Sequence, residues 1–333
     1  MAEIVLGIAT SHGPMLSTPP HQWDLRVPDD LRGTHHYQGR TWSFEELVQL
    51  REREHLARQI VPARWEARHA ACRSAIAALS DAFERARPDV AVLVGNDQME
   101  IFDDSIIPAF SVLWGDKVVN GMYSDERMAN LPPGIGVSVP GHIPPGGATY
   151  PAVPDLGRHI IETAIEDNFD VAAMKRLPKD ETPHAFGFVY RQIMRDRVVP
   201  SVPVLVNTFY PPNQPSISRC NAFGKSLLRA IKSWPADARV ALIASGGLTH
   251  FVIDENVDRY VLDSIRQRGV ERIADLGEAV FQAGTSEIKN WIPVASAMAD
   301  LGYPFTLVDY VPCYRTAAGT GNAMGFVYWQ RPA

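Results

Sequence analysis

Short apolar runs rich in β-branched residues recur along the chain and predict β-strands. The run at residues 89–95, DVAVLVG, is apolar at almost every position, which is typical of a strand buried on both faces of a parallel or mixed sheet. The first run, residues 4–9, leads directly into the loop-forming sequence Thr-Ser-His-Gly-Pro. The predicted strands span residues 4–9, 89–95, 108–114, 169–174, 202–207, 239–245, 305–310 and 323–329.

Longer segments with apolar residues at helical spacing separate these runs. Ser43 is expected to cap a helix that starts at Glu45, and Pro88 ends a long amphipathic helix at residues 63–86. Strand and helix alternate, which predicts the α/β class: a single domain over residues 1–333, with a central mixed sheet flanked by helices and long active-site loops. The remaining predicted helices span residues 156–166, 220–233, 254–267 and 286–301.

Two long segments show no clear periodic pattern. Residues 17–44 are polar and rich in proline and aromatic residues, and they are predicted to form an irregular excursion rather than regular structure. Residues 121–149 are rich in glycine and proline. Long loops of this kind in compact domains often form lids or the walls of a site.

Charge and composition exclude several classes of function. The net charge is -6, with acidic and basic residues interleaved over the whole length, so no basic surface that binds nucleic acid is expected. No apolar run approaches a membrane span, and the N-terminus shows no signal-peptide pattern, which predicts a cytoplasmic protein without a membrane partner. The three cysteines are far apart in the sequence and lack metal-ligand spacing, which fits a reducing compartment.

Polar side chains of the types that bind metals or move protons follow several predicted strands. They are His12, residues 96–98 (Asn-Asp-Gln), Asn207 and His250. Ligands of open α/β sheets bind beyond the carboxyl ends of the strands, so this repetition predicts a site there. Each residue alone also has a structural interpretation: His12 as a hydrogen-bonded loop histidine, and the segment SGGLTH that ends at His250 as a tight turn with a capping threonine.

Two further residues are candidates, each with an alternative. Glu287 opens a predicted helix, where the helix dipole favours a carboxylate whatever the function. It could equally be the carboxylate of a two-histidine-one-carboxylate iron site. His184, in the apolar and aromatic segment TPHAFG, is either a structural imidazole or a group beside a ring-shaped substrate.

Six ordered segments that span nearly the whole chain carry a family resemblance. They are GIATSHGPML, PDVAVLVGNDQMEIFDDSIIPAF, PHAFGFVY, VPVLVNTFYPP, ASGGLTH and GTSEIKNW. Together they resemble the class III extradiol dioxygenases, the superfamily of the protocatechuate 4,5-dioxygenase catalytic subunit and of the gallate and 3-O-methylgallate dioxygenases, the methylgallate type being the closest. The resemblance implies cleavage of a catechol- or gallate-type ring with O2 at a non-haem Fe(II) centre, in the breakdown of aromatic or lignin-derived compounds.

The resemblance also implies roles for particular residues. His12 and Glu287 would be iron ligands, while His250 would be the acid/base histidine. His184 would be a further active-site histidine. Asn322 falls in the C-terminal segment that lies near the substrate carboxylate in the protocatechuate enzyme, and its amide could hydrogen-bond such a group. A turn before the last predicted strand is the alternative for Asn322.

The sequence departs from the family pattern at the second histidine ligand. Gln98 stands where the protocatechuate enzyme has that histidine. The Gln98 carbonyl oxygen could fill the ligand position, although an amide is a weaker donor than imidazole for a first-row metal. Alternatively, a loop histidine could replace it: His35, His36 or His142.

The departure keeps alternative functions open. A zinc-dependent hydrolase on the same fold and a non-catalytic scaffold relative both fit the loss of an iron ligand. The expected partners are a small aromatic diol and O2, together with a second copy of the chain in a homodimer. The sequence leaves open the exact phenol and the need for a small partner subunit, since the long loop after His12 could cover the pocket instead.

Overall fold

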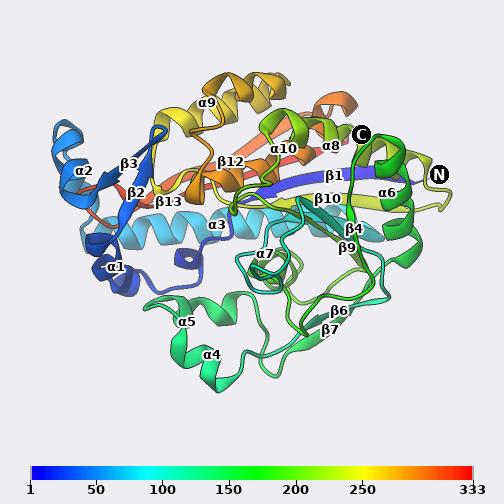
Figure 1. Cartoon of the computed structure of the whole chain (residues 1–333), viewed down its shortest axis with the longest axis horizontal. Coiled ribbons are helices and arrows are strands. Elements are labelled where there is room, and N and C mark those ends of the chain that lie inside the picture. Colours follow the sequence, from blue (N-terminus) through cyan, green and yellow to red (C-terminus); the bar gives the residue numbers. More distant parts are fainter. Residues whose placement is uncertain (1, 332–333) are drawn as a thin grey trace.

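Nine strands of the computed structural model, which describes residues 2–331, form one mixed sheet (Figure 1). These strands are β1 (Glu3–Thr10), β4 (Val90–Gly95), β5 (Phe110–Leu113), β8 (Ala172–Met174), β9 (Ser201–Val206), β10 (Arg239–Ser245), β11 (His250–Val252), β12 (Phe305–Tyr314) and β13 (Thr320–Gln330). Their order is β11-β13-β1-β10-β4-β9-β5-β8, and β12 also pairs with β13. Two small hairpins lie outside this sheet: β2 (Thr34–Tyr37) with β3 (Arg40–Ser43), and β6 (Lys117–Asn120) with β7 (Ala148–Pro151).

Helices cover both faces of the sheet. The α-helices are α1 (Val27–Arg32), α2 (Phe44–Leu50), α3 (Pro62–Ala86), α4 (Asp125–Asn130), α5 (Ile135–Ser138), α6 (Pro154–Glu166), α7 (His184–Phe188), α8 (Ile217–Ser233), α9 (Glu255–Arg266) and α10 (Ile288–Leu301). Buried side chains of α3 and α7 join one hydrophobic core, and those of α6, α8 and α10 join the other. In Figure 1, α4 and α5 lie at the lower edge of the molecule, away from the sheet.

The inner strands are buried on both faces, as their continuous apolar runs predicted. All six residues of β4 are buried, with Val92 in one core and Leu93 in the other. Successive side chains of a strand point to opposite faces, so a run without polar positions fills both cores. The inner strands could therefore be predicted from the sequence, because burial on both faces gives a continuous apolar run.

The strand directions bring several loops to one edge of the sheet. β1 is parallel to β10, β10 to β4, and β4 to β9. Their carboxyl ends therefore lie at the same edge: Thr10, Ser245, Gly95 and Val206. β13 runs antiparallel to β1 and to β11, so its first residues reach that edge as well.

The α/β class and the central mixed sheet flanked by helices are confirmed. Every strand and helix predicted from the periodic pattern is present, and β12 continues to Tyr314, beyond its predicted end at Tyr310. Ser43 caps α2 as expected, because its hydroxyl accepts from the Glu46 amide while the Glu46 carboxylate accepts from the Ser43 amide. Local sequence signals were therefore sufficient for these elements.

The prediction that residues 17–44 form an irregular excursion is wrong. The segment contains a 3-10 helix (Pro20–Arg26), α1 and the β2–β3 hairpin. Trp23 anchors it, because its buried indole donates from Nε1 to the Met15 and Thr18 carbonyl oxygens. Such short elements are held by tertiary contacts rather than by a periodic apolar face, so a pattern search misses them.

Two expectations from composition concern the membrane and the cysteines. Within residues 2–331, no helix combines the length and the apolar character that crossing a bilayer requires. The three cysteines are free and buried, and the Sγ atoms of Cys72 and Cys313 lie 3.9 Å apart.

Helices α8 and α10 are in close contact at Gly224. A Cβ atom at this position would lie 2.3 Å from the Pro293 carbonyl oxygen and 2.7 Å from the Pro293 Cα. Because both are backbone atoms, Gly224→Ala is expected to lower the free energy of unfolding by about 1–3 kcal/mol, which outweighs a gain of up to about 1 kcal/mol in helix propensity. Urea unfolding measures the change.

Lys225→Ala is the matched control, because Lys225 is exposed on the same helix. Its unfolding midpoint is expected to stay near that of the wild type. A Gly224→Ala variant as stable as this control would show that the two helices are not in such close contact.

Candidate active site

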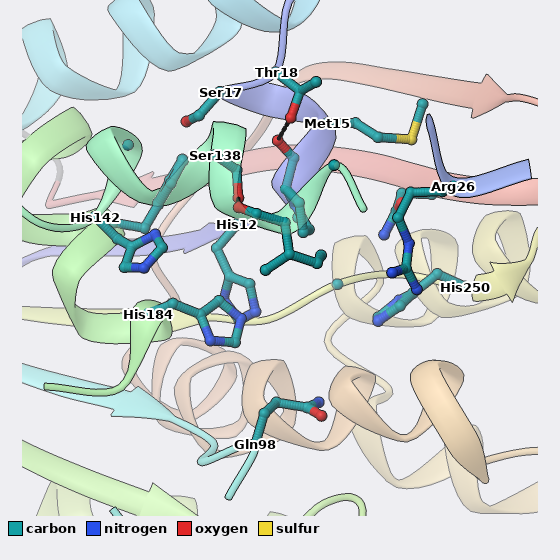
Figure 2. A pocket seen from close by; sticks show the side chains of 18 of the residues that line it. His12, Met15, Ser17, Thr18, Arg26, Gln98, Ser138, His142, His184 and His250 are labelled. Carbon is teal, nitrogen blue, oxygen red and sulfur yellow. Dashed lines mark hydrogen bonds between the residues drawn. The ribbon is translucent and has the colours of Figure 1, made fainter. Parts of the chain in front are cut away.

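A cavity of about 340 Å³ opens at the edge of the sheet where β1, β4 and β10 end. Small-molecule sites typically occupy roughly 300–1,000 Å³. All six residues that the sequence assigned to a site line this cavity: His12, Gln98, His184, His250, Glu287 and Asn322. Figure 2 shows four of them, with the imidazoles of His12, His184 and His250 directed toward the same space.

The carboxylate of Glu287 lies at the centre of this group. Its Oε2 atom is 3.2 Å from His12 Nε2 and 3.6 Å from His250 Nε2, and it accepts a 2.9 Å hydrogen bond from the Gly247 amide. Only 3% of Glu287 is exposed. It directly precedes α10, yet its side chain makes no capping hydrogen bond to that helix. Its contacts are therefore with the cavity residues rather than with the helix that it precedes.

Two side-chain amides hold the other oxygen of Glu287. Gln98 Nε2 donates to Oε1 at 2.9 Å, and Asn96 Nδ2 donates to the same atom at 3.3 Å. Asn290 in α10 donates in turn from Nδ2 to the side-chain oxygen Oδ1 of Asn96 at 2.7 Å. A buried carboxylate needs such donors because it has lost its hydration. The loop that follows β4 thus helps to fix the orientation of Glu287.

The hydrogen bond at Nδ1 fixes the tautomer of His250, whereas the partner of Nδ1 at His12 is a hydroxyl. His250 Nδ1 lies 2.8 Å from the Leu248 carbonyl oxygen, which can only accept, so this Nδ1 carries a proton. In the neutral ring, the basic nitrogen of His250 is then Nε2, the atom that faces Glu287. His12 Nδ1 lies 2.9 Å from the Ser245 hydroxyl, which can donate or accept.

Burial and charge act against each other on these three groups. Burial alone would raise the pKa of Glu287, but the His250 and His12 rings lower that pKa well below its usual value. Burial lowers the pKa of His12 by more than the Glu287 charge raises it. Burial also lowers the pKa of His250, but there the Glu287 carboxylate outweighs it and the net shift is upward. An ionised Glu287 is thus held between a neutral His12 and a more basic His250.

A second buried pair, Glu100 and His184, adjoins the first. His184 Nδ1 lies 3.0 Å from each Glu100 carboxylate oxygen, and the His184 amide donates to Oε1 at 2.9 Å. The His184 ring packs edge-on against the His12 ring, with 4.6 Å between centroids. The Tyr123 hydroxyl lies 3.3 Å from Glu100 Oε1 and 3.4 Å from His142 Nε2.

This pairing separates the pKa values of neighbouring groups. Burial opposes ionisation, yet the Glu100 carboxylate raises the pKa of His184 to about 9. Burial would raise the pKa of Glu100, but His184 together with His142 lowers it to about 2. Burial and the His184 charge lower the pKa of His142 to about 3. Near neutral pH, the wall of the cavity therefore holds a His184 cation, a Glu100 anion and a neutral His142.

Three polar residues marked by the sequence lie elsewhere. His35 Nε2 is 2.7 Å from the Asp30 carbonyl oxygen, and His36 Nε2 is 2.7 Å from the Ala279 carbonyl oxygen. Neither histidine lines the cavity, so the structure contradicts both as replacement ligands. The β2–β3 hairpin directs them to backbone acceptors instead. Asn207 follows β9 as expected, but its side chain holds its own turn and does not line the cavity.

His142, the third possible replacement, does line the cavity, and its ring packs near Tyr123. Gln98, in contrast, contacts Glu287 directly. Gln98 is therefore the residue that stands with Glu287 and His12 at the position where the family pattern expects a second histidine.

The donor set determines whether a metal can be held here. Within residues 2–331, no three or more histidine, cysteine, aspartate and glutamate side chains are arranged to hold a metal ion. A His12 nitrogen and a Glu287 oxygen are nevertheless donors that a first-row metal accepts. A half-turn of the Gln98 amide would replace the Nε2 atom now bonded to Glu287 by the carbonyl oxygen. The residues present therefore fit a metal through one imidazole, one carboxylate and one amide.

Asn322 lies within β13, so the alternative of a turn before that strand is wrong. In the antiparallel register Asn322 pairs with His250 of β11, which brings both residues to the cavity. A Cβ atom on Gly13 would be 3.0 Å from Asn322 Nδ2, so the amide lies against the loop that follows β1.

Five ionisable residues among those described line the cavity but were not predicted from the sequence. Glu100 follows a predicted strand in the same segment as Gln98, and that position was the signal that could have found it. The others lie in segments whose positions depend on tertiary packing, and no sequence signal placed them beside the histidines. The missed residues are Arg26, Glu100, Tyr123, Arg127 and Arg315.

Comparison with known proteins assigns the chain to a family. Residues 66–263 match the family described as the catalytic LigB subunit of aromatic ring-opening dioxygenase, and the chain belongs to this family. The matched segment includes Gln98, His184 and His250 and ends before Glu287.

Individual relatives are similar over part of the chain. Gallate dioxygenase of Pseudomonas putida is 34% identical over 103 residues, which are 30% of this chain and 29% of that protein. The 2,3-dihydroxyphenylpropionate/2,3-dihydroxicinnamic acid 1,2-dioxygenase of Comamonas testosteroni is 25% identical over 178 residues, 53% of this chain and 47% of that protein. The matches thus span less than half of each relative. The crystal structure of an uncharacterized Escherichia coli K12 protein covers 76% of this chain and 91% of its own, at 15% identity and a TM-score of 0.45.

The Glu100→Gln variant tests whether the Glu100–His184 ion pair contributes to stability, because that contribution depends on pH. The pKa of Glu100 falls from 4.5 to about 2, so its contribution to stability is present above pH 4.5 and is lost as the pH falls toward 2. The pKa of His184 rises from 6.5 to about 9, so its contribution is present below pH 6.5 and is lost as the pH rises toward 9. Wild type is expected to exceed the variant most between about pH 4.5 and 6.5, by roughly 3–5 kcal/mol.

Urea unfolding of wild type and variant at about pH 5.5 and about pH 9.5 measures this difference. Glu66→Gln, at an exposed position of α3, is the control for the loss of a carboxylate. A stability difference that is the same at both pH values would contradict the proposed charge pair.

Proposed function

We propose that this protein cleaves the ring of an aromatic diol with O2 at a bound Fe(II), outside the two hydroxyl groups. The observation that carries the proposal is the convergence of His12, His250 and Gln98 on the buried Glu287 carboxylate, at the edge of the mixed sheet where its parallel strands end. Membership of a family of aromatic ring-opening dioxygenases supports it. Two partial relatives are named as dioxygenases, one of gallate and one of dihydroxyphenylpropionate.

In this proposal, His12, Glu287 and Gln98 hold the iron through an imidazole nitrogen, a carboxylate oxygen and the amide oxygen. When bound, Fe(II) would supply the capacity to bind the diol and to activate O2. The Ser245 hydroxyl at His12 Nδ1 fixes which ring nitrogen faces the site, and the Gly247 amide holds the carboxylate in the same way.

His250 is suited to take a proton from a hydroxyl group of the diol. The Leu248 carbonyl keeps the ring proton on Nδ1, so the basic Nε2 faces the cavity. Burial lowers the pKa of His250, but Glu287 shifts it upward overall, which keeps the proton on Nε2 available for return to an oxygen of the opened ring. His250 thus acts as a proton shuttle and not as a ligand.

His184 and Asn322 complete the polar wall around the substrate. Glu100 occupies His184 Nδ1 and keeps the ring protonated, so the Nε2 proton remains for an oxygen atom in the cavity. The Asn322 amide can hydrogen-bond a substituent of the ring. Gallate, 3-O-methylgallate and protocatechuate are the substrates that we propose, within the breakdown of lignin-derived aromatic compounds. The cytoplasmic location and the homodimer stay predictions.

Oxygen consumption by anaerobically purified protein loaded with Fe(II) tests this function directly. Gallate, 3-O-methylgallate and protocatechuate are added separately, and the loss of ring absorbance and the metal content are followed on the same sample. Consumption of O2 in step with ring loss is the expected result. Bound iron without oxygen uptake on any of the three would count against the activity, and no binding of iron would favour a hydrolase or a scaffold.

Alanine variants separate the proposed ligands from the proposed acid/base group. His12→Ala and Glu287→Ala are each expected to lose iron and activity together, because each removes a ligand. His250→Ala is expected to retain iron but to lose roughly 100-fold or more in turnover. Iron content per protein and initial rates are measured for each variant. Full iron content in either ligand variant would refute its assignment.

Substitutions of Gln98 test the departure from the family pattern. Gln98→His is expected to bind Fe(II) more tightly than wild type, because imidazole is a stronger donor than an amide oxygen, and Gln98→Ala is expected to bind it more weakly. Competition with a chromogenic chelator under anaerobic conditions measures these affinities. Identical affinities in all three proteins would place Gln98 outside the ligand set.

A further inference from the structure

Three arginines line the cavity, and two of them have a carboxylate of their own. Arg315 is bound to Asp30 by two hydrogen bonds, of 2.5 Å from Nε and 2.8 Å from Nη2. Arg127 forms an ion pair with Glu181 and lies over the Tyr123 ring, 3.9 Å from its centroid. The charges of these two guanidinium groups are therefore compensated within the protein.

Arg26, the third arginine, shares its carboxylate partner, Asp29, with Arg32. Its Nη1 lies 3.2 Å from Asp29 Oδ2, but Asp29 also accepts a 2.7 Å hydrogen bond from Arg32. This Nη1 atom is buried and makes no hydrogen bond within residues 2–331. Burial and the neighbouring Arg315 charge lower the pKa of Arg26, as expected of an incompletely compensated cation. Figure 2 shows the guanidinium directed into the cavity on the side of His250.

Gln22 adds a second unpaired polar group to the same wall. It lies in the 3-10 helix that ends at Arg26, and it also lines the cavity. Its Oε1 atom is buried and has no hydrogen-bond partner in the described part of the chain. Rotation of the amide can present either its oxygen or its nitrogen to a ligand. Buried polar groups are almost always hydrogen-bonded, so these two atoms leave hydrogen-bonding capacity unused in one wall of the cavity.

The segment that carries both residues is fixed in place. Trp23, between them in the sequence, is only 2% exposed, and its indole nitrogen is bonded to the Met15 and Thr18 carbonyl oxygens. A guanidinium on an anchored segment loses less freedom when it binds a ligand than one on a mobile loop. The position of Arg26 is therefore set before a ligand enters.

We propose that Arg26, assisted by Gln22, binds a carboxylate substituent on the ring of the substrate and so determines the preference of the site for acidic diols. This inference rests on the proposed function, because it takes the diol hydroxyls to lie at the Glu287 end of the same cavity. A guanidinium binds a carboxylate through two parallel N–H bonds, a match that a neutral substituent lacks. The His184 imidazole, unlike Arg26, is already paired with a carboxylate of its own, Glu100.

Arg26→Met removes the charge and keeps most of the side-chain length. Binding to the Fe(II)-loaded protein is measured by anaerobic calorimetry for protocatechuate and for 4-methylcatechol, which has a methyl group in place of the carboxylate. The variant is expected to bind protocatechuate roughly 10- to 100-fold more weakly and the neutral diol as wild type does. Arg26→Lys, which keeps the charge without the planar fork, is expected to retain part of the preference.

Arg32→Met is the matched control, since it removes the same charge from the same Asp29 but at a side chain that is 72% exposed. Its ratio of affinities is expected to equal that of the wild type. If Arg26→Met binds both diols more weakly by the same factor, or binds both as wild type does, the ratio of the two affinities is unchanged and the inference is overturned. The anaerobic measurement detects binding without turnover, so the two proposals can fail separately. Binding that depends on Arg26 but is not followed by O2 consumption would refute only the proposed function. Ring cleavage with an unchanged ratio of affinities would refute only this inference.

Discussion

The buried carboxylate of Glu287 is the constraint on which the rest of the site depends. A carboxylate with so little exposure has lost its hydration, so the protein must supply donors and positive charge around it. Three loops do so: His12 follows β1, Gln98 follows β4 and Gly247 follows β10. These loops meet only because β1, β10 and β4 are parallel neighbours. The order of the strands is therefore what permits an ionised Glu287 in the interior.

The same physical arrangement occurs a second time in the cavity, where Glu100 pairs with His184 beside the His12 ring. Burial acts on all of these groups, and a facing carboxylate outweighs it at His184 and His250 but not at His12. His184 becomes a cation because the Glu100 carboxylate faces it, whereas His142 stays neutral because burial, together with the His184 charge, lowers its pKa. Different environments thus separate the pKa values of similar residues within one cavity. Such separation places a neutral imidazole, His12, beside a protonated one, His184.

Chemistry and recognition have separate structural origins in this protein. The groups proposed to hold the metal and move protons lie at the ends of strands or beside them, where the packed sheet restricts their movement. The groups proposed to select acidic substrates, Gln22 and Arg26, come from the 3-10 helix Pro20–Arg26 outside the sheet. Loops on a rigid scaffold can change the ligand without changing the sheet. The two parts of the site can therefore vary independently.

The sequence by itself determined the inner strands and the main helices, because burial on one face or on both leaves a local periodic pattern. Together with the family resemblance, it also assigned to one site six residues that do line one cavity: His12, Gln98, His184, His250, Glu287 and Asn322. Only the tertiary structure decided that His35 and His36 bind backbone oxygens elsewhere, and that Glu100 and Arg26 enter the cavity. These contacts join residues far apart in the chain, and packing between distant segments leaves no local pattern from which to predict them.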